Sequence, residues 1–268
     1  MNTLSSAPPW DMVAYGYATS AMDFFQQFSA AALNIVPVQS GDCIADIACG
    51  PGTLALQAAQ TGAQISAVDF SVNMLAQLEQ AVADLEIENL EVIHGDGQRL
   101  LFEDDTFDAA FSMFALMFYP DRKAGFRELF RIVRPGGAAT VATFSSIEKS
   151  PLLRQIFAVT RAMLPDQPAQ TYDVDSLENP KTLMAEMTEA GFKNVKIHPV
   201  VRELEFASAE QFVKRMAEGS APLHLLRIRM SEDQWQERLS QAIEQLNWDA
   251  GPFPRKLSAT ALLAVGYK

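Results

Sequence analysis

Between residues 43 and 144 the chain alternates short apolar runs with segments in which apolar side chains recur every three or four positions. The short runs have the length of strands, and the segments between them have the spacing of amphipathic helices. This alternation is typical of a parallel sheet that helices cover on both faces, so we predict a doubly wound, Rossmann-like α/β fold. The strands are expected at residues 43–48, 64–69, 90–95, 107–113 and 138–144.

Several helices have recognisable ends. The first is predicted over residues 22–36. Ser71 is expected to cap the N-terminus of the second helix, because its hydroxyl can accept a hydrogen bond from a backbone N–H in the first turn. The fourth helix contains residues 126–133 and is expected to stop at 134–137, where the sequence Arg-Pro-Gly-Gly interrupts the helical pattern.

Beyond the fifth strand the order of elements changes. We expect a helix over residues 151–164, a polar, proline-containing loop over 165–180, and a further helix that ends at Gly191. A long strand candidate follows at 193–206, and Pro199 within it indicates an edge strand or a bulge.

A segment of helical character separates this strand from the last one. Two capping-box signatures mark the helix starts within it, Ser208 with Gln211 and Ser231 with Gln234. We interpret the segment as a small helical cap over the carboxyl edge of the sheet, with simple packing helices as the alternative. The predicted units are an N-terminal helical segment, a mostly parallel core, the cap and an antiparallel last strand, at residues 1–40, 41–204, 205–250 and 251–268.

Composition excludes several classes of protein. The chain has 268 residues, of which 49% are hydrophobic and 20% are charged, and its mean hydropathy is close to zero. This profile is that of a globular protein rather than a disordered or fibrous one. The 21 Lys and Arg against 33 Asp and Glu give a net charge of −12. Such a surface repels a phosphate backbone, so no nucleic-acid partner is expected.

Two further features bear on location. The uncharged run 109–120 is shorter than the roughly 20 residues of a membrane helix, and residues 1–12 have neither the basic nor the apolar region of a secretory signal. The two cysteines, Cys43 and Cys49, are better explained as reduced thiols than as a disulfide framework. We therefore expect a cytoplasmic monomer or homodimer without membrane insertion.

The loops that follow the first three strands carry glycines and acids. In an open parallel sheet, ligands bind outside the carboxyl ends of the strands. Gly50 and Gly52, in the first loop, let the backbone approach a ligand closely at a helix N-terminus. Asp69 ends the second strand 19 residues after Gly50, where a carboxylate can accept hydrogen bonds from both hydroxyls of a ribose. Asp96 follows the third strand, so we predict a site for a nucleoside-containing cofactor.

Four segments resemble motifs of the class I S-adenosylmethionine-dependent methyltransferases, and in particular of the small-molecule branch that includes the ubiquinone and menaquinone biosynthesis C-methyltransferases. They read IADIACGPGTLAL, AVDFSVNML, GDGQRLLFEDDTFDAAFSMFALMF and FRELFRIVRPGGAATVATF. The resemblance implies an enzyme of class EC 2.1.1 that uses S-adenosyl-L-methionine and releases S-adenosyl-L-homocysteine. Ala48 stands where the family often has a glycine, and a methyl group is tolerable there if the local backbone is extended.

The resemblance also implies roles for individual residues. Asp46 would interact with the amino end of the methionine, Asp69 would bind the ribose, and Asp96 would accept from the adenine amino group. The remaining cofactor residues would border the adenine, the ribose and the methionine: Tyr15, Tyr17, Ala48, Gly50, Gly52, Phe70, Met74, Gly97, Ser112, Met113 and Phe114. Tyr15 and Tyr17 are expected just before the first helix, where an aromatic ring near a sulfonium gains cation–π attraction.

The acceptor is expected to be a small, largely apolar or aromatic molecule. The residues predicted to contact it are Trp10, Met117, Phe118, Tyr119 and His224. Methyl transfer from a sulfonium is an in-line displacement that needs no dedicated nucleophile, so His224 is only a weak catalytic candidate. The loop after the fourth strand lacks the Asn-Pro-Pro-Tyr signature of the nucleic-acid amino-methyltransferases, and no group of ligands suggests a metal.

Two alternatives remain at this stage. A catalytically inactive protein that binds S-adenosylmethionine, as a scaffold or sensor, would need the same cofactor residues. An NAD-dependent oxidoreductase is the less favoured alternative, because Gly50, Gly52 and Ala55 with Asp69 downstream also satisfy the dinucleotide fingerprint.

Overall fold

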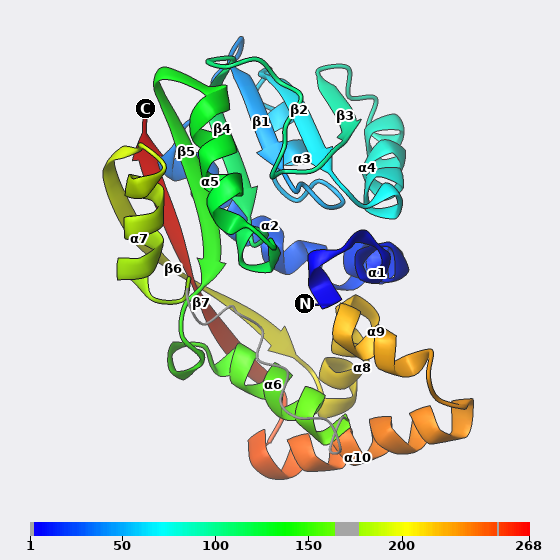
Figure 1. Ribbon diagram of the computed structural model, residues 1–268. Coiled ribbons are helices and arrows are strands. Elements are labelled where there is room, and N and C mark those ends of the chain that lie inside the picture. Colours follow the sequence, from blue (N-terminus) through cyan, green and yellow to red (C-terminus); the bar gives the residue numbers. More distant parts are fainter. Residues whose placement is uncertain (1–2, 164–176, 251) are drawn as a thin grey trace.

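The computed structural model describes residues 3–163, 177–250 and 252–268, so most of the predicted loop 165–180 lies outside the described residues. Seven strands form one sheet in the order β3-β2-β1-β4-β5-β7-β6 (Figure 1). Strands β1 to β5 run parallel, and β7 is antiparallel to both of its neighbours. The predicted fold class is therefore confirmed. The strands are β1 (Cys43–Ile47), β2 (Gln64–Asp69), β3 (Leu90–His94), β4 (Phe107–Met113), β5 (Val133–Phe144), β6 (Lys193–Phe206) and β7 (Arg255–Tyr267).

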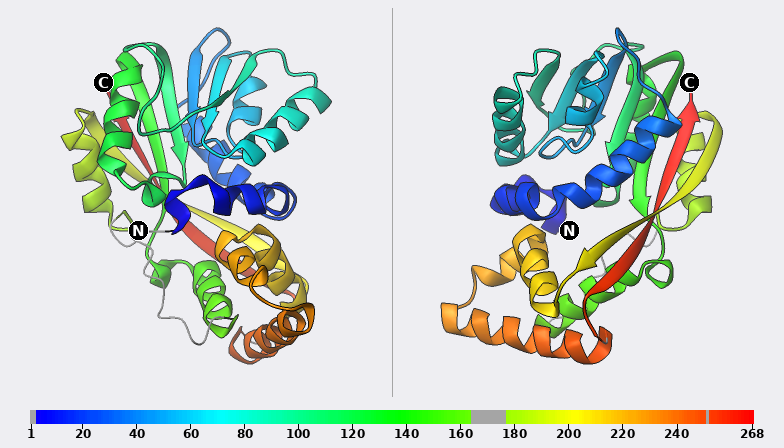
Figure 2. Two further views of the ribbon diagram at one scale, coloured as in Figure 1. Left: turned by 45° about the vertical axis from the view of Figure 1, so that its right-hand side comes forward. Right: turned by 180° about the vertical axis from the view of Figure 1, so that it is seen from behind.

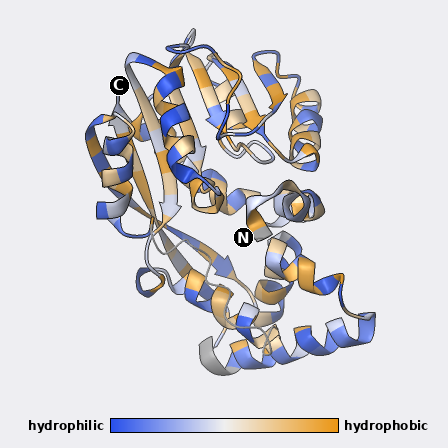
Figure 3. Cartoon of the chain, viewed as in Figure 1, coloured by the Kyte–Doolittle hydropathy of each residue, from blue (hydrophilic) through white to orange (hydrophobic). Residues whose placement is uncertain are grey.

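Helices cover both faces of the sheet (Figures 1 and 2). α5 and α7 pack on one face, α2 and α3 lie on the other, and α4 packs beside β2 and β3. The central strands are mostly hydrophobic, whereas α4 and α5 alternate between hydrophobic and hydrophilic residues (Figure 3), as expected when strands are buried on both faces and helices on one. The α-helices are α1 (Ala7–Ser20), α2 (Met22–Ile35), α3 (Ala55–Ala59), α4 (Val72–Asp84), α5 (Arg122–Ile132), α6 (Pro151–Met163), α7 (Pro180–Glu189), α8 (Ala209–Gly219), α9 (Ala221–Arg227) and α10 (Glu232–Ala250). Three short 3₁₀ helices are η1 (Thr3–Ser5), η2 (Leu116–Phe118) and η3 (Ile147–Lys149).

Two element boundaries differ from the prediction. The sequence pattern predicts the first helix over 22–36, but α1 precedes it and contains the tyrosines that were expected before any helix. Pro8 and Pro9 stand in the first turn of α1, where backbone N–H groups have no partner within the helix. Val133 was predicted to end the fourth helix and instead begins β5, where it pairs with Phe107. The residue before a proline avoids helical dihedrals, which favours the strand over a longer helix at Arg134.

The predicted insertion folds as helices between the two longest strands. β6 and β7 have 14 and 13 residues, and α8, α9 and α10 lie beyond the parallel strands (Figure 1). Ser208 Oγ accepts from Gln211 N–H at 3.1 Å to start α8, and Ser231 and Gln234 form a reciprocal capping box at 3.3 and 3.0 Å before α10. β6 is the edge strand of the sheet, as Pro199 predicts.

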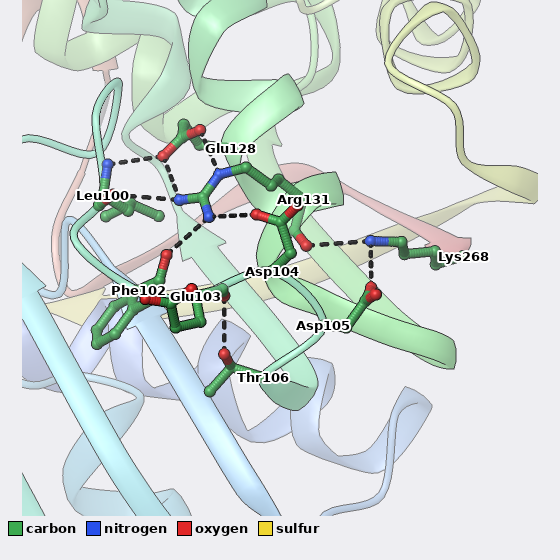
Figure 4. Close-up of polar contacts among 9 residues, drawn as sticks. All are labelled: Leu100, Phe102, Glu103, Asp104, Asp105, Thr106, Glu128, Arg131 and Lys268. Atoms are coloured by element: carbon green, nitrogen blue, oxygen red, sulfur yellow. Dashed lines mark hydrogen bonds and ion pairs between the residues drawn. The ribbon is translucent and has the colours of Figure 1, made fainter.

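Arg131, on α5, holds the loop between β3 and β4 in place. Its guanidinium donates to both carboxylate oxygens of Glu128 at 2.8 Å and to Asp104 at 2.8 Å (Figure 4). It also donates to the carbonyl oxygens of Leu100 at 3.1 Å and Phe102 at 2.7 Å. The Arg131 hydrogen bonds lower the pKa of Glu128. The loop is therefore tied to α5 by charge-assisted hydrogen bonds, which are stronger than neutral ones.

We expect Arg131→Ala to lower the free energy of unfolding by about 2 to 3 kcal/mol, because Glu128 and two loop carbonyls lose a charged donor. Urea denaturation measures this loss. Arg127→Ala is the matched control: the Arg127 side chain is 61% exposed and lies 3.5 Å from Asp121, so its removal should change stability by less than about 0.5 kcal/mol. Equal losses in the two variants would contradict the role given to Arg131.

Candidate active site

A cavity of about 890 Å³ lies at the carboxyl ends of β1, β2, β3 and β4. The strand order reverses between β1 and β4, which is where an open parallel sheet binds its ligands. α1 and the cap helices α8 and α9 lie across these strand ends (Figures 1 and 2). The cavity therefore has the strand ends and their loops on one side and helices on the other, and its volume suits a small-molecule site.

The loop after β1 combines an unusual backbone with close packing. Ala48 has φ 57° and Gly50 has φ 55°, and both line the cavity. The condition under which a methyl group at Ala48 would be tolerated, an extended backbone, is not met: the residue is left-handed, which costs a residue with a side chain roughly 1 to 2 kcal/mol. Gly52, at φ 90°, lies off the cavity wall, and a Cβ there would overlap the side chain of Leu78. Gly52 thus lets the loop pack against α4.

Asp46 lies behind this loop, inside β1. Its side chain is buried, and Oδ2 accepts a hydrogen bond from the backbone N–H of Ala55 at 3.0 Å, at the start of α3. Burial raises the pKa of Asp46 to about 7, the Ala55 hydrogen bond offsets part of this rise, and the charge of Asp69 adds to it. The group does not lie on the cavity wall.

Asp69 ends β2 and faces the cavity. Its Oδ2 accepts from Gly50 N–H and its Oδ1 from Ser71 N–H, both at 2.8 Å. Burial raises the pKa of Asp69, these backbone hydrogen bonds offset part of the rise, and the charge of Asp11 adds to it. The backbone N–H of Phe70 also contributes to stabilising this carboxylate. A carboxylate has about four lone-pair sites, so it can still accept a hydrogen bond from a ligand.

Asp11 anchors α1 to the edge of this site. Ser71 Oγ accepts from Met74 N–H at 3.2 Å, which confirms Ser71 as the cap of α4, and donates to Asp11 Oδ1 at 2.6 Å. The backbone N–H and side-chain amide of Asn73 donate to the Asp11 carboxylate and carbonyl oxygen, each at 3.1 Å. The same serine therefore contacts both the acid that lines the cavity and the helix that covers it.

One face of α1 closes the cavity. Trp10 and Tyr17 lie one above the other on this face and line the cavity, whereas Tyr15 is 72% exposed and points away. The Trp10 ring meets Phe118 edge-on at 5.2 Å, and the Tyr17 ring stacks on Phe25 at 5.4 Å. Burial, and to a smaller extent the charge of Asp69, raise the pKa of Tyr17, so its phenol stays neutral.

The loops after β3 and β4 meet on the opposite wall. Asp96 Oδ1 accepts from the backbone N–H of Gln98 at 2.9 Å and from its side-chain amide at 3.1 Å. The side-chain oxygen of Gln98, Oε1, accepts from Asp121 N–H at 2.9 Å, and Asp121 caps α5 through Ala124 N–H at 3.0 Å. A Cβ at Gly97 would overlap the Tyr119 hydroxyl. The backbone of the first loop and the phenol of the second are therefore in direct contact.

Three phenylalanines form an aromatic wall beyond β4. Phe114 contacts Phe144 at 4.6 Å and Phe25 at 5.0 Å between ring centroids, and all three line the cavity. Phe114 has φ 59°, a left-handed conformation that is a genuine outlier for a bulky residue. Its N–H donates to Ala142 O at 2.9 Å, which holds the ring in place at the end of the strand. Strain of this kind concentrates at functional sites.

The far half of the cavity is mainly apolar and is enclosed by α6 and the cap. Its lining side chains are Leu152, Leu153, Ile156, Phe157, Thr160, Leu204 and Met216. Within the described residues, Arg215 is the single basic side chain on the wall, and it is engaged by the carboxylate of Asp23 and the carbonyl of Ser20. A Cβ at Gly16 would overlap the backbone of Glu218, so α1 and α8 touch without a side chain between them.

The structure brings most of the predicted residues to one cavity. Those on its wall are Trp10, Tyr17, Ala48, Gly50, Asp69, Phe70, Met74, Asp96, Gly97, Met113, Phe114, Met117, Phe118 and Tyr119. Those off the wall are Tyr15, Asp46, Gly52, Ser112 and His224. Asp46 and Ser112 are buried. His224 is partly exposed on α9, and it does not line the cavity although Ser220, Ala221 and Pro222 beside it do.

Sequence reasoning missed several residues of the wall. Gln98 follows Asp96 by two positions and was not considered. The α6 row was recognised only as a helix, although Leu152, Ile156 and Thr160 recur every four residues and so share one face. Phe25 and Phe144 come from segments more than 100 residues apart, and no local pattern predicts that they meet.

The described part of the chain contains neither a candidate metal site nor a helix that could span a membrane. No group of three His, Cys, Asp or Glu side chains there could hold a metal ion. No helix there combines the length and the hydropathy that crossing a membrane requires.

Comparison with known proteins places the chain among methyltransferases. A family model described as a methyltransferase domain matches residues 44–137. The demethylmenaquinone methyltransferase of Bacillus subtilis is 33% identical over 180 residues, which cover 62% of this chain and 77% of that protein. The protein of the same description from Corynebacterium kroppenstedtii is 32% identical over 166 residues, covering 58% and 69% respectively. Among solved structures, the YcgJ protein of Bacillus subtilis matches 90% of this chain and 98% of its own, with a TM-score of 0.61 and 16% identity.

The fold and these relatives define a class I methyltransferase that uses S-adenosylmethionine as its cofactor. Within that class, the chain belongs to the family of small-molecule methyltransferases that includes the demethylmenaquinone methyltransferases. The sequence motifs predicted both the class and the branch, and both are confirmed. The oxidoreductase alternative is not supported.

We expect Asp46→Asn to remove a pH dependence of stability. In the folded state Asp46 titrates near pH 7, above its range in the unfolded chain, so the wild type becomes less stable as the pH rises from about 4 to 7. Relative to wild type, the variant should gain roughly 2 to 4 kcal/mol at pH 8, and less at pH 5.5.

Urea denaturation of both proteins between pH 5.5 and 8.5 measures this difference. The control is Asp84→Asn, which makes the same substitution at an exposed position at the end of α4. A difference between Asp46→Asn and wild type that stays constant with pH would contradict the raised pKa.

Proposed function

We propose that this enzyme transfers the methyl group of S-adenosylmethionine to a small, largely apolar or aromatic acceptor. The observation that carries the proposal is the composition of the cavity: acids and backbone groups surround one half, and apolar side chains from α6, β6 and α8 surround the other. A cavity divided in this way suits a polar, cationic cofactor beside an apolar co-substrate.

The acidic half has the donors and acceptors that the cofactor needs. Asp69 retains acceptor capacity for the ribose hydroxyls, and Asp96 Oδ2 for the adenine amino group. Phe70 and Met74 lie beside Asp69 on the same wall and would flank the adenine. The cofactor carries a sulfonium and an ammonium group, and a site surrounded by carboxylates favours both.

The methionine end of the cofactor would lie between the first loop and the aromatic wall. Ala48 and Gly50 line the cavity there, and Gly50 leaves open space where a side chain would stand. Tyr17 and Met113 border the same region. Asp46 lies behind this loop. Its hydrogen bond with Ala55 N–H fixes the start of α3, and its charge would attract the ammonium group of the cofactor.

Bound S-adenosylmethionine supplies an activated methyl group on sulfur. Phe25, Phe114 and Phe144 exclude water from this region, and aromatic faces stabilise a nearby sulfonium by about 0.5 to 2 kcal/mol. The protein's contribution is alignment of the acceptor with the methyl group along the line of displacement. We assign no catalytic base, because His224 lies off the wall and an amine acceptor that loses its proton to the solvent needs none.

The acceptor half disfavours an anionic molecule, because its lining is mainly apolar and the carboxylates of Glu148 and Glu178 also line the cavity. Arg215 is engaged by Asp23 and Ser20, so its charge is not offered to an anionic acceptor. The side chains of α6 supply an apolar surface along one helix face. In this proposal residues 1–40 cover the cofactor, residues 205–250 cap the acceptor, and the core of 41–204 with the last strand, 251–268, holds both.

A test of turnover separates this proposal from a scaffold that only binds the cofactor. The purified protein is incubated with S-adenosylmethionine and a panel of phenols, hydroquinones and amines that carry an apolar ring or chain, and S-adenosylhomocysteine is measured. We expect its release with at least one apolar acceptor and not with polar analogues of the same nucleophile. Binding of cofactor without release in any mixture would support the scaffold instead.

For the cofactor half, we expect Asp69→Ala to weaken binding of both S-adenosylmethionine and S-adenosylhomocysteine by about 1 to 3 kcal/mol, because the charge-assisted hydrogen bonds to the ribose are lost. Calorimetric titration measures the affinities. Asp84→Ala, which changes an exposed acid on α4, is the control and should bind as the wild type does. Unchanged affinity in Asp69→Ala would contradict the assignment of the ribose site.

For the acceptor half, we expect Phe157→Glu to raise the KM for the best acceptor of the panel at least about tenfold, because a charge is placed in an apolar compartment. Phe157 lines the cavity but is 38% exposed, so the variant should fold. Cofactor affinity should not change. Leu101→Glu is the control, since Leu101 is 90% exposed and is not on the wall. An unchanged KM in Phe157→Glu would place the acceptor elsewhere.

A further inference from the structure

Gln98 lies between the acid of the β3 loop and the start of α5. Its side chain lines the cavity beside Asp96. The amide nitrogen donates to Asp96 Oδ1 at 3.1 Å and is 3.4 Å from Oδ2, and the Gln98 backbone N–H donates to Oδ1 at 2.9 Å. The amide oxygen accepts from Asp121 N–H at 2.9 Å.

Both ends of the Gln98 amide are fixed by their partners. A backbone N–H can only donate, so the Asp121 contact requires the amide oxygen, and an ionised carboxylate can only accept, so the Asp96 contact requires the amide nitrogen. The orientation of the side chain is therefore determined by chemistry, and the amide cannot turn over without losing both hydrogen bonds. The capped N-terminus of α5 thereby holds Gln98 rigidly against Asp96.

The two carboxylate oxygens of Asp96 differ in the hydrogen bonds that they accept. Oδ1 accepts two donors from Gln98, which fill its lone pairs, whereas Oδ2 has only the long contact at 3.4 Å. One strong acceptor therefore remains on a carboxylate that lines the cavity. A ligand that places an N–H donor there is favoured. A ligand that places an oxygen acceptor there is disfavoured, because its oxygen and the carboxylate oxygen repel each other.

We propose that Gln98 is a positioning residue that turns Asp96 toward the cavity and makes the site select a purine bearing an exocyclic amino group. The inference rests on the proposed function, which assigns Asp96 to the adenine of the cofactor. Gln98 acts through Asp96 and contributes discrimination between bases in addition to affinity. Without Gln98, Asp96 is free to rotate into solvent, and its hydrogen bond to the amino group is lost in part of the population.

A purely structural role would give a different result. If Gln98 only tied the two loops together, Gln98→Glu would be mild, since a carboxylate oxygen can still accept from Asp121 N–H. Positioning predicts instead weaker binding of S-adenosylhomocysteine and a smaller preference for it over the inosine compound, because the carboxylate of the variant repels Asp96 where the amide had held it.

The test compares S-adenosylhomocysteine with its inosine counterpart, in which an oxygen replaces the exocyclic amino group. Calorimetric titrations are made with the wild type, Gln98→Met, Gln98→Glu, Asp96→Asn and the double variant Asp96→Asn with Gln98→Met. Gln80→Met is the matched control, because Gln80 donates to Asp84 at 2.7 Å on the exposed side of α4, the same pair of groups outside the cavity. Thermal unfolding without ligand checks that each variant is folded.

We expect the wild type to prefer the adenine compound by about tenfold or more. Gln98→Met and Gln98→Glu should reduce this ratio at least about threefold, mainly through weaker binding of S-adenosylhomocysteine. In the Asp96→Asn background, Gln98→Met should leave the ratio unchanged, since the residue acts through that carboxylate. Gln80→Met should behave as the wild type.

Three outcomes would overturn the inference, and they are distinguishable. An undiminished ratio in both Gln98 variants overturns the positioning role alone. An equal effect of Gln98→Met with Asp96 present or replaced shows that Gln98 does not act through Asp96. A wild type that binds S-adenosylhomocysteine without preferring it over the inosine compound overturns the assignment of Asp96, and with it the part of the proposed function on which this inference rests.

Discussion

Two carboxylates buried at the ends of neighbouring strands constrain the rest of this site. Asp46 and Asp69 belong to β1 and β2, which pair along their length. Burial raises the pKa of both carboxyl groups. Among the described residues, the charges that raise their pKa values are those of other acids. The compensation comes from backbone N–H groups, so the glycine loop and the starts of α3 and α4 are arranged to point donors at these two groups. A positively charged ligand would offset the negative charge of these buried carboxylates, which no basic side chain of the described residues lowers in pKa.

The core of the fold was predictable because its pattern is local. Each of the five parallel strands is a short apolar run between helices of regular period, and Ser71 and Pro199 act through rules that depend on their own neighbours only. The extent of β5 was not predictable from the same rules. Its first residue, Val133, continues the apolar period of α5, and only pairing with Phe107 on β4 decides between the two structures.

The candidate site likewise has one half that local sequence predicts and one half that depends on distant contacts. Its acidic half comes from loops adjacent to recognisable strands, so the residues could be named from spacing and resemblance. Its apolar half depends on contacts between distant segments: Phe25 from α2 meets Phe114 and Phe144, and α6 shares a wall with α8. Tyr15 and Tyr17 show the limit of a sequence argument at close range, because two positions on a helix separate a side chain on the wall from one that is 72% exposed.

α1 connects the two halves. At one end Asp11 is bonded to Ser71 and Asn73 beside the cofactor half, and at the other Gly16 crosses the backbone of Glu218 in the cap. Trp10 and Tyr17 lie just outside these two contacts along the helix, and both line the cavity. The position of one helix is therefore set jointly by the core and the cap.

The cap occupies a single interruption of the chain between β6 and β7, two strands that pair with each other along their whole length. The loops after β1 to β4, which carry Asp69 and Asp96, lie well before this interruption in the chain. Mutation, insertion or recombination between residues 207 and 254 can therefore change the part of the cavity wall that α8 supplies, including Arg215 and Met216, without altering those loops. The two parts of the wall are encoded in separate stretches of the gene, so one can vary in evolution while the other is kept.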